Sequence, residues 1–68
     1  EITNILTIRE KEIVDLVKKG LSYKQMSDLL FITTYTINYH LKNIYKKLGI
    51  HSKSELLSLL MDKRALIS

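Results

Sequence analysis

The stretch "TTYTINYHLKNIYKKLGI", residues 33–50, combines a regular apolar spacing with an unusual polar surface. At about 100° per residue, its apolar residues fall within an arc of roughly 60° on a helix. This spacing predicts one helix of about 15 residues, or four turns, that buries a single stripe. Thr33 is placed to cap its start, and Gly49 to follow its end. The residues of the stripe are Ile37, Leu41, Ile44 and Leu48.

The opposite side of this helix carries lysine, asparagine and tyrosine, and the whole stretch contains no acid. An ordinary solvent-facing side mixes lysine with glutamate and gains from pairs at i,i+4 spacing. Lysine and asparagine are side chains that read guanine and adenine edges in the major groove of DNA. The pattern therefore indicates a recognition surface for nucleic acid, and a lysine face kept for solubility is the alternative. The residues of this side are Tyr35, Asn38, Tyr39, Lys42 and Lys46.

Two helices are predicted before this stretch by their start signals. Thr7 with Glu10, and Ser22 with Gln25, have the spacing of a capping box. Gly20 stands where the first of these helices should end. The second is short, about two turns. The residues that we expect the two helices to bury are Ile13, Leu16, Val17, Met26, Leu29 and Leu30.

A fourth helix is predicted after the stretch. Ser52 with Glu55 gives a third capping box, and the helix should run through "KSELLSLLMDKRAL", residues 53–66. Four helices, short connections and no strand-like alternation predict an all-α fold, a compact four-helix domain that contains a helix-turn-helix. The chain length of 68 residues suits one domain, residues 1–68, rather than two.

Charge and composition narrow the classes of function. The net charge is +4, and the whole excess lies in residues 33–54, which is typical of a nucleic-acid partner. With no cysteine and two histidines, we expect no metal site and no cofactor. We also find no nucleophile–base pair and no glycine-rich phosphate loop, so we expect no catalytic residues and no enzyme activity. No apolar run reaches the roughly 20 residues of a membrane span, so we expect no membrane partner and a cytoplasmic location.

The short second helix and the long third helix, joined by a tight turn, form the predicted helix-turn-helix. In that geometry the second helix of the pair enters the major groove. The starts of both helices, and lysines one turn beyond the base-reading positions, should then meet the DNA backbone. The expected phosphate contacts are Ser22, Tyr23, Lys24, Thr33, Thr34, Tyr35, Thr36, Lys46 and Lys47.

The chain from Leu6 to about Ile67 resembles the LuxR/GerE-type DNA-binding domain. The resemblance rests on the opening "LTIREKE", on a T-[IV]-x-x-H motif at residues 36–40 and on a K-L-G-[IV] motif at residues 47–50. It implies a four-helix domain that binds double-stranded DNA as a dimer and regulates transcription. The family's base-reading positions map onto Asn38, Tyr39 and Lys42.

The resemblance has further implications. Such a domain is usually the C-terminal output of a larger bacterial regulator, for example a response regulator with a receiver module, and some members stand alone. RNA polymerase is then a candidate partner, and the protein would be associated with the nucleoid. The chain departs from the family pattern at several positions: Met26, Ser27, Asn38, Lys53, Leu56 and Leu60. Of these, Asn38 replaces a favoured lysine, so base preference at that position does not carry over.

The fourth helix has more apolar surface than one core requires. Its apolar residues, which lie between 56 and 61, spread over roughly 200° of the circumference. A symmetric copy of the same helix is the simplest cover, and it fits the dimer that the resemblance implies. Looser packing against the first helix is the alternative. The expected dimer interface consists of Leu57, Leu60, Met61 and Arg64.

Two other readings remain open at the level of sequence. A sigma-factor-like promoter-binding domain shares the "LTxRExE" opening, but it typically has glycine where this chain has Phe31 and lacks a histidine at the position of His40. A helical protein–protein adaptor would carry apolar patches on the third helix rather than lysine, asparagine and tyrosine. The favoured reading is a dimer on an inverted repeat whose half-sites lie about 10 base pairs apart.

Overall fold

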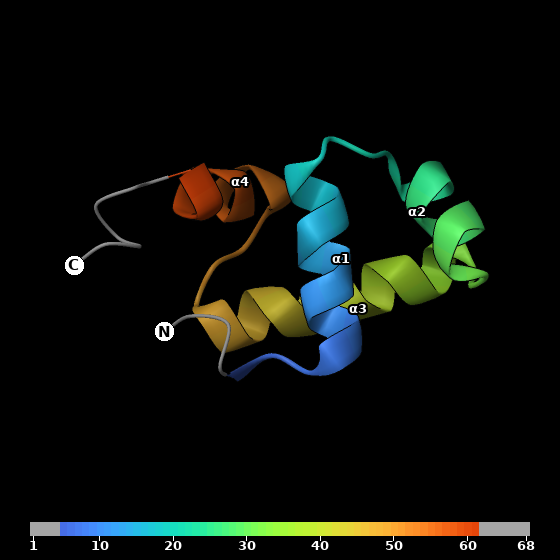
Figure 1. Cartoon of the computed structure of the whole chain (residues 1–68). Coiled ribbons are helices and arrows are strands. Elements are labelled where there is room, and N and C mark those ends of the chain that lie inside the picture. The colour runs from blue at the N-terminus through green and yellow to red at the C-terminus, as the bar shows by residue number, and fades with distance from the viewer. Residues whose placement is uncertain (1–4, 62–68) are drawn as a thin grey trace.

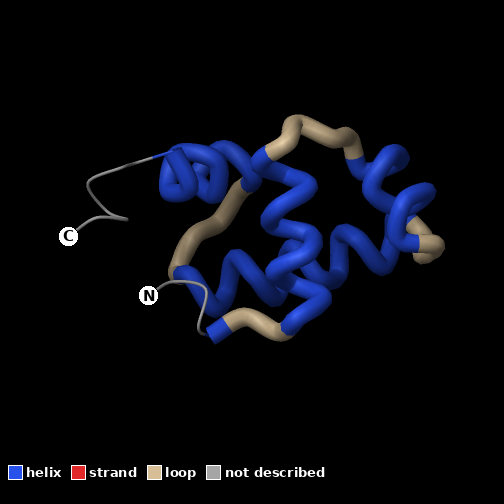
Figure 2. Tube along the Cα trace, in the orientation of Figure 1, coloured by secondary structure: helices blue, strands red, loops and turns tan. Residues whose placement is uncertain are grey.

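The computed structural model describes residues 5–61 of the chain. This part forms four helices, α1 (Ile8–Lys18), α2 (Tyr23–Leu30), α3 (Thr34–Leu48) and α4 (Lys53–Met61). No strand is present among these residues, as the tube in Figure 2 shows. The predicted all-α fold with a helix-turn-helix, formed by α2 and α3, is confirmed. The assignment of residues 1–68 to one domain stays a prediction.

The longest helix, α3, runs along one side of the molecule, and α1 crosses it (Figure 1). Helix α2 packs against α3, whereas α4 packs against α1. In Figure 1, α2 and α4 therefore lie on opposite sides of α1. This arrangement leaves the side of α3 that faces away from α1 and α2 uncovered within the described part of the chain.

The starts of the first three helices are capped as the sequence predicts. The Thr7 hydroxyl accepts the Glu10 N–H at 3.1 Å, and the Glu10 carboxylate accepts the Thr7 N–H at 2.9 Å. Ser22 and Gln25 exchange the same pair of bonds at 3.1 and 2.8 Å. The Thr33 hydroxyl accepts the Thr36 N–H at 3.0 Å, which confirms Thr33 as the cap of α3. Each bond satisfies an N–H group that the helix itself leaves unpaired.

Left-handed residues end three of the helices. Gly20 after α1 and Gly49 after α3 have φ values of +83° and +71°. Because an added Cβ would meet no described atom within 4 Å at either position, backbone conformation rather than space favours glycine there. Helix α2 ends differently, on Phe31 with φ +58° and an exposed ring. The turn of the helix-turn-helix thus passes through a residue type that rarely adopts this conformation.

The core lies between α1, α3 and the inner sides of α2 and α4. The predicted stripe of α3 is confirmed, because Ile37, Leu41 and Ile44 are fully buried and Leu48 packs against them half-buried. Tyr45 is also packed against the core. Within residues 5–61, the buried apolar residues are Leu6, Ile13, Val14, Val17, Met26, Ile37, Leu41, Ile44, Leu56 and Leu60.

One core prediction on α2 was wrong. Leu29 is 56% exposed, whereas Met26 is fully buried, Ser27 is buried and Leu30 is half-buried. The buried side of α2 is centred between Met26 and Ser27, and Leu29 lies about 110° from that centre at 100° per residue. Leu29 therefore lies outside the side of α2 that packs against α3.

The start of α4 differs in detail from the predicted capping box. The Ser52 hydroxyl accepts the Glu55 N–H at 3.2 Å, as expected. However, the Glu55 carboxylate accepts the N–H of His51 rather than that of Ser52. The reciprocal bond is therefore shifted by one residue into the preceding turn. The predicted continuation of this helix beyond Met61 lies outside the described residues.

Candidate nucleic-acid interface

The uncovered side of α3 carries the side chains that the sequence places there. Tyr35 is 80% exposed and Tyr39 is 58% exposed, and both lysines of this side, Lys42 and Lys46, are also exposed. Asn38 is half-buried at the border of this side. Two large aromatic side chains and two lysines thus share one surface without a carboxylate of α3. We call these five residues the recognition face.

A contact between neighbouring rings orients part of the recognition face. The rings of Tyr39 and His40 meet edge to face, with centroids 5.6 Å apart and an interplanar angle of 67°. His40 is half-buried, on the border of the core stripe. Edge-to-face pairs of this kind favour defined ring positions. His40 therefore restricts the tyrosine that the sequence assigns to base reading.

The first turn of α3 is exposed and carries hydroxyl groups. The hydroxyls of Thr33 and Thr36 lie 3.0 Å apart, in addition to the bond from the Thr36 N–H. Thr33, Thr34 and Tyr35 are exposed, and Thr36 is half-buried. The first turn of a helix leaves N–H groups without helical acceptors, and its dipole favours an anion. The arrangement is compatible with the predicted phosphate contacts here, which stay predictions.

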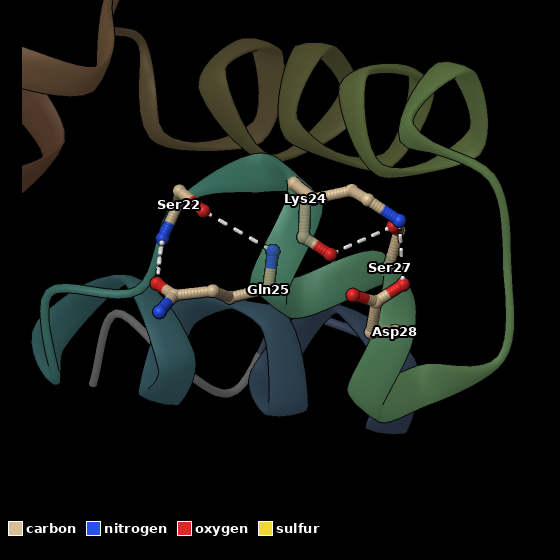
Figure 3. A network of polar contacts seen from close by, with 5 residues as sticks. All are labelled: Ser22, Lys24, Gln25, Ser27 and Asp28. Carbon is tan, nitrogen blue, oxygen red and sulfur yellow. Dashed lines mark hydrogen bonds and ion pairs between the residues drawn. The ribbon is translucent and has the colours of Figure 1, made fainter.

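The start of α2 forms a small polar network, which Figure 3 shows. Besides the capping box, the Lys24 ammonium lies 3.0 Å from the Asp28 carboxylate, and the Ser27 hydroxyl donates to the Lys24 carbonyl at 2.9 Å. The ion pair between Lys24 and Asp28 is exposed, so it contributes only about 0.2–1 kcal/mol. Lys24 is therefore available to a phosphate group that competes with Asp28.

Tyr23 is less exposed than a phosphate contact at a helix start would suggest. Its ring is half-buried and packs against the core, and the Lys53 ammonium lies 5.5 Å from the ring centroid. Burial, together with the neighbouring Tyr23 hydroxyl, raises the pKa of Tyr45 to about 12. Tyr23 thus connects the starts of α2 and α4 with the C-terminal half of α3.

An ion pair that the sequence did not reveal links α3 to α1. The Lys47 ammonium lies 2.6 Å from the Glu10 carboxylate, whose side chain is only 5% exposed, whereas that of Lys47 is 35% exposed. Burial raises the pKa of Glu10, but the hydrogen bonds from Lys47 and Thr7 outweigh this, so the pKa lies below its ordinary value. The capping carboxylate of α1 therefore also holds the C-terminal end of α3.

This pair changes the description of Lys47. The sequence placed it among the phosphate contacts, but its ammonium is engaged with Glu10. At 100° per residue, Lys47 lies about 140° around α3 from Lys42, on the side toward α1. The two partners are 37 positions apart, and both match common local patterns, a capping box and a lysine-rich helix end. Neither pattern predicts the contact between Lys47 and Glu10.

Helix α4 uses its apolar residues unequally. Leu60 was expected in a dimer interface, but it is buried in the core of the chain itself, as Leu56 is. The spacing of four residues places both on the side of α4 that packs toward α1. Leu57 is half-buried, and Met61 is 77% exposed. Arg64, the other expected interface residue, lies outside the described residues.

Comparison with known proteins decides the family. The family model described as bacterial regulatory proteins, luxR family, matches residues 4–60. The chain belongs to the luxR family. Its helix-turn-helix is accordingly a DNA-binding element, and its general function is the regulation of transcription. The chain is therefore assigned to the luxR family rather than to the sigma factors, which share the opening motif.

Curated luxR-family relatives agree with the match. The chain is 39% identical over 62 residues to the oxygen regulatory protein NreC of Staphylococcus aureus, in strains JH9, JH1 and NCTC 8325 among others. The matched part is 91% of this chain but 29% of each relative. The chain thus spans about a third of the length of these curated relatives.

Two further observations concern other kinds of site. Within residues 5–61, no three histidine, cysteine, aspartate or glutamate side chains gather as they would around a metal ion. In the same part of the chain, no helix has both the length and the apolar character needed to cross a membrane.

Proposed function

We propose that this luxR-family domain binds double-stranded DNA with α3 in the major groove, where Asn38, Tyr39 and Lys42 read base edges. The observation that carries the proposal is the recognition face, an exposed surface with lysine and tyrosine and without an acid of α3. Lysine and asparagine can donate to guanine and adenine edges, and tyrosine offers a flat apolar surface to bases and sugars. As ordinary solvent surface, this face would expose two large aromatic rings to water at a cost in free energy.

The starts of α2 and α3 supply phosphate contacts in this proposal. The contacting groups would be the exposed hydroxyls and N–H groups of these two first turns, together with Lys24 of α2 and Lys46 near the end of α3. Each phosphate neutralised by a lysine releases counterions, so affinity should fall steeply as salt rises. Lys47 would contact a phosphate only after its ion pair with Glu10 is broken.

A dimer on an inverted repeat completes the proposal. The exposed Met61 and the half-buried Leu57 lie one turn apart on α4 and form the apolar surface that a second copy would cover. Two-fold symmetry then places the two recognition helices in half-sites about 10 base pairs apart.

The domain would act within a longer regulator. The matched segment is 29% of each relative, so we propose that it is the output domain of a response regulator or a similar protein. Its site of action would be the bacterial nucleoid in the cytoplasm, with RNA polymerase as a further partner.

Selection of bound duplexes from a random DNA library tests the proposed function. We expect a palindromic consensus with two half-sites about 10 base pairs apart. A single conserved half-site would contradict the dimer but not DNA recognition. Recovery of unenriched sequences at low salt would contradict base reading altogether.

Two lysine variants separate base reading from backbone contact. Lys42→Ala should cost about 1–3 kcal/mol of binding and relax specificity at one position of the selected site. Lys46→Ala should weaken selected and random duplexes alike and reduce the salt slope by about 1. Fluorescence anisotropy with both duplexes across a salt series measures both effects. Equal loss of specificity in the two variants would show that the recognition face is assigned incorrectly.

The dimer is tested by placing a charge on α4. Met61→Glu should shift the domain to monomers, because a carboxylate would be buried against its symmetric copy without a partner. Leu29→Glu is a matched control, since it makes a similar change at an exposed apolar residue of α2. Analytical ultracentrifugation at high micromolar concentration compares them with the wild type. A wild type that is monomeric with and without DNA would refute the dimer.

A further inference from the structure

The lysines of the domain fall into two groups according to their partners. Ion pairs with carboxylates engage Lys19, Lys24 and Lys47. Within residues 5–61, no carboxylate lies within ion-pair distance of Lys42, Lys46 or Lys53, the other lysines in the segment that holds the positive excess. Of these three, Lys53 alone has its ammonium over an aromatic ring, 5.5 Å from the centroid of Tyr23.

The position of that ring places Lys53 beside the recognition face. Tyr23 and Tyr45 both pack against the core, Tyr45 belongs to α3, and burial together with the Tyr23 hydroxyl raises the pKa of Tyr45. At 100° per residue, Tyr45 lies about 60° around α3 from Lys42 and nearly one turn further along. Tyr23 and Lys53 therefore adjoin the lysine-bearing half of the face, although they come from α2 and α4.

The contact with the ring suits Lys53 to bind a second, anionic partner. A cation over an aromatic ring gains about 0.5–1 kcal/mol at an exposed site, which restricts the side chain without neutralising its charge. An ammonium group has three donors, and the ring occupies only one side of it. Lys53 is half-buried, so its stem is held while its charge stays close to solvent.

We propose that Lys53 contacts a phosphate of the DNA backbone, with Tyr23 as the residue that positions its ammonium. The proposal rests on the proposed DNA-binding function and extends the interface from the helix-turn-helix to the start of α4. Tyr23 then acts through its ring, and its hydroxyl faces Tyr45 rather than DNA.

The salt dependence of binding tests the phosphate contact. For Lys53→Met, which keeps an apolar stem over the ring, we expect the slope of log affinity against log salt to decrease by about 0.9. Affinity for selected and random duplexes should fall by the same factor, up to about tenfold at 0.1 M salt. Lys11→Met is the control for net charge, because it removes the same charge from an exposed position on α1. An equal decrease for both variants would reveal only an effect of net charge and would overturn the proposal.

A double-mutant cycle tests the role of Tyr23. Tyr23→Leu removes the ring and should weaken binding several-fold, and Tyr23→Phe, which restores a ring at this position, should reverse most of that loss. Tyr23→Leu should have no further effect in the Lys53→Met background, because the positioned group is then absent. Circular dichroism identifies any variant that fails to fold, and Lys53→Gln replaces Lys53→Met in that case. Independent effects of the two changes would overturn the positioning role.

The outcomes also separate this proposal from the one on which it rests. In one outcome, Lys42→Ala weakens DNA binding but Lys53→Met has the same salt slope as the wild type. This outcome would refute the phosphate contact of Lys53 and leave the proposed DNA-binding function intact. Absence of salt-dependent binding by the wild type refutes both.

Discussion

Replacing Lys47 by methionine should destabilise the domain by about 1–3 kcal/mol at pH 7. The variant leaves the Glu10 carboxylate, 5% exposed, without its ammonium partner, and breaking a buried pair in this way costs about 3–5 kcal/mol. We expect a smaller loss because Lys47 is 35% exposed, so the pair is partly solvated, and because the Thr7 N–H still donates to the carboxylate. Urea unfolding, followed by circular dichroism, measures the difference. For a domain of this length, total stability is about 3–10 kcal/mol, so the loss is large.

The dependence of this loss on pH identifies its cause. In the wild type the pKa of Glu10 is lowered in the folded state, so the pair stabilises the fold above the ordinary carboxylate pKa. This contribution is lost as pH falls through the lowered pKa of the folded state. Without Lys47, the folded-state pKa of Glu10 rises, so the variant takes up its proton at higher pH. The difference between the two proteins should therefore shrink as pH falls through the interval between their two Glu10 pKa values.

A neighbouring lysine provides the control for Lys47. Lys46→Met removes the same charge from the same helix, but Lys46 is exposed and has no carboxylate partner among the described residues. We expect its stability to stay within about 0.5 kcal/mol of the wild type. Equal stabilities of the two variants, or a difference that does not change with pH, would rule out the stabilising role of the pair.

Replacing Leu41 by alanine should cost about 2–5 kcal/mol, because Leu41 is fully buried in the middle of the α3 stripe. The loss combines the transfer free energy of the removed methyl groups with the cavity that remains. In a domain of marginal stability it should leave a measurable unfolded fraction at 37 °C. Thermal unfolding followed by circular dichroism, with the same measurement in urea, gives the change.

The matched control for Leu41 is Leu29, a leucine that the apolar pattern of α2 predicts to be buried but that is exposed. Leu29→Ala makes the same chemical change at a side chain that is 56% exposed, so its effect should stay within about 0.5 kcal/mol. A similar loss for the two variants would mean that burial does not govern these positions.

The sequence by itself determined the helices and the recognition face. Capping residues such as Thr33 and stop residues such as Gly49 act within one turn, so their effects can be derived from local spacing. The division of α3 into a buried and an exposed side follows from the helical repeat, which fixes Ile37 and Lys42 on different sides before any partner is known. Local order of this kind does not depend on the rest of the fold.

The tertiary structure decided which side chains find partners across helices. Lys47 and Glu10 lie 37 positions apart, and Lys53 reaches Tyr23 from another helix. Leu60 joined the core, whereas Leu29 stayed exposed, because the width of each buried side depends on how closely the neighbouring helix approaches. The charge and apolar character of each side chain determine which kind of partner it can bind. Only the packing of α1 and α2 against α3, and of α4 against α1, brings a particular partner within reach.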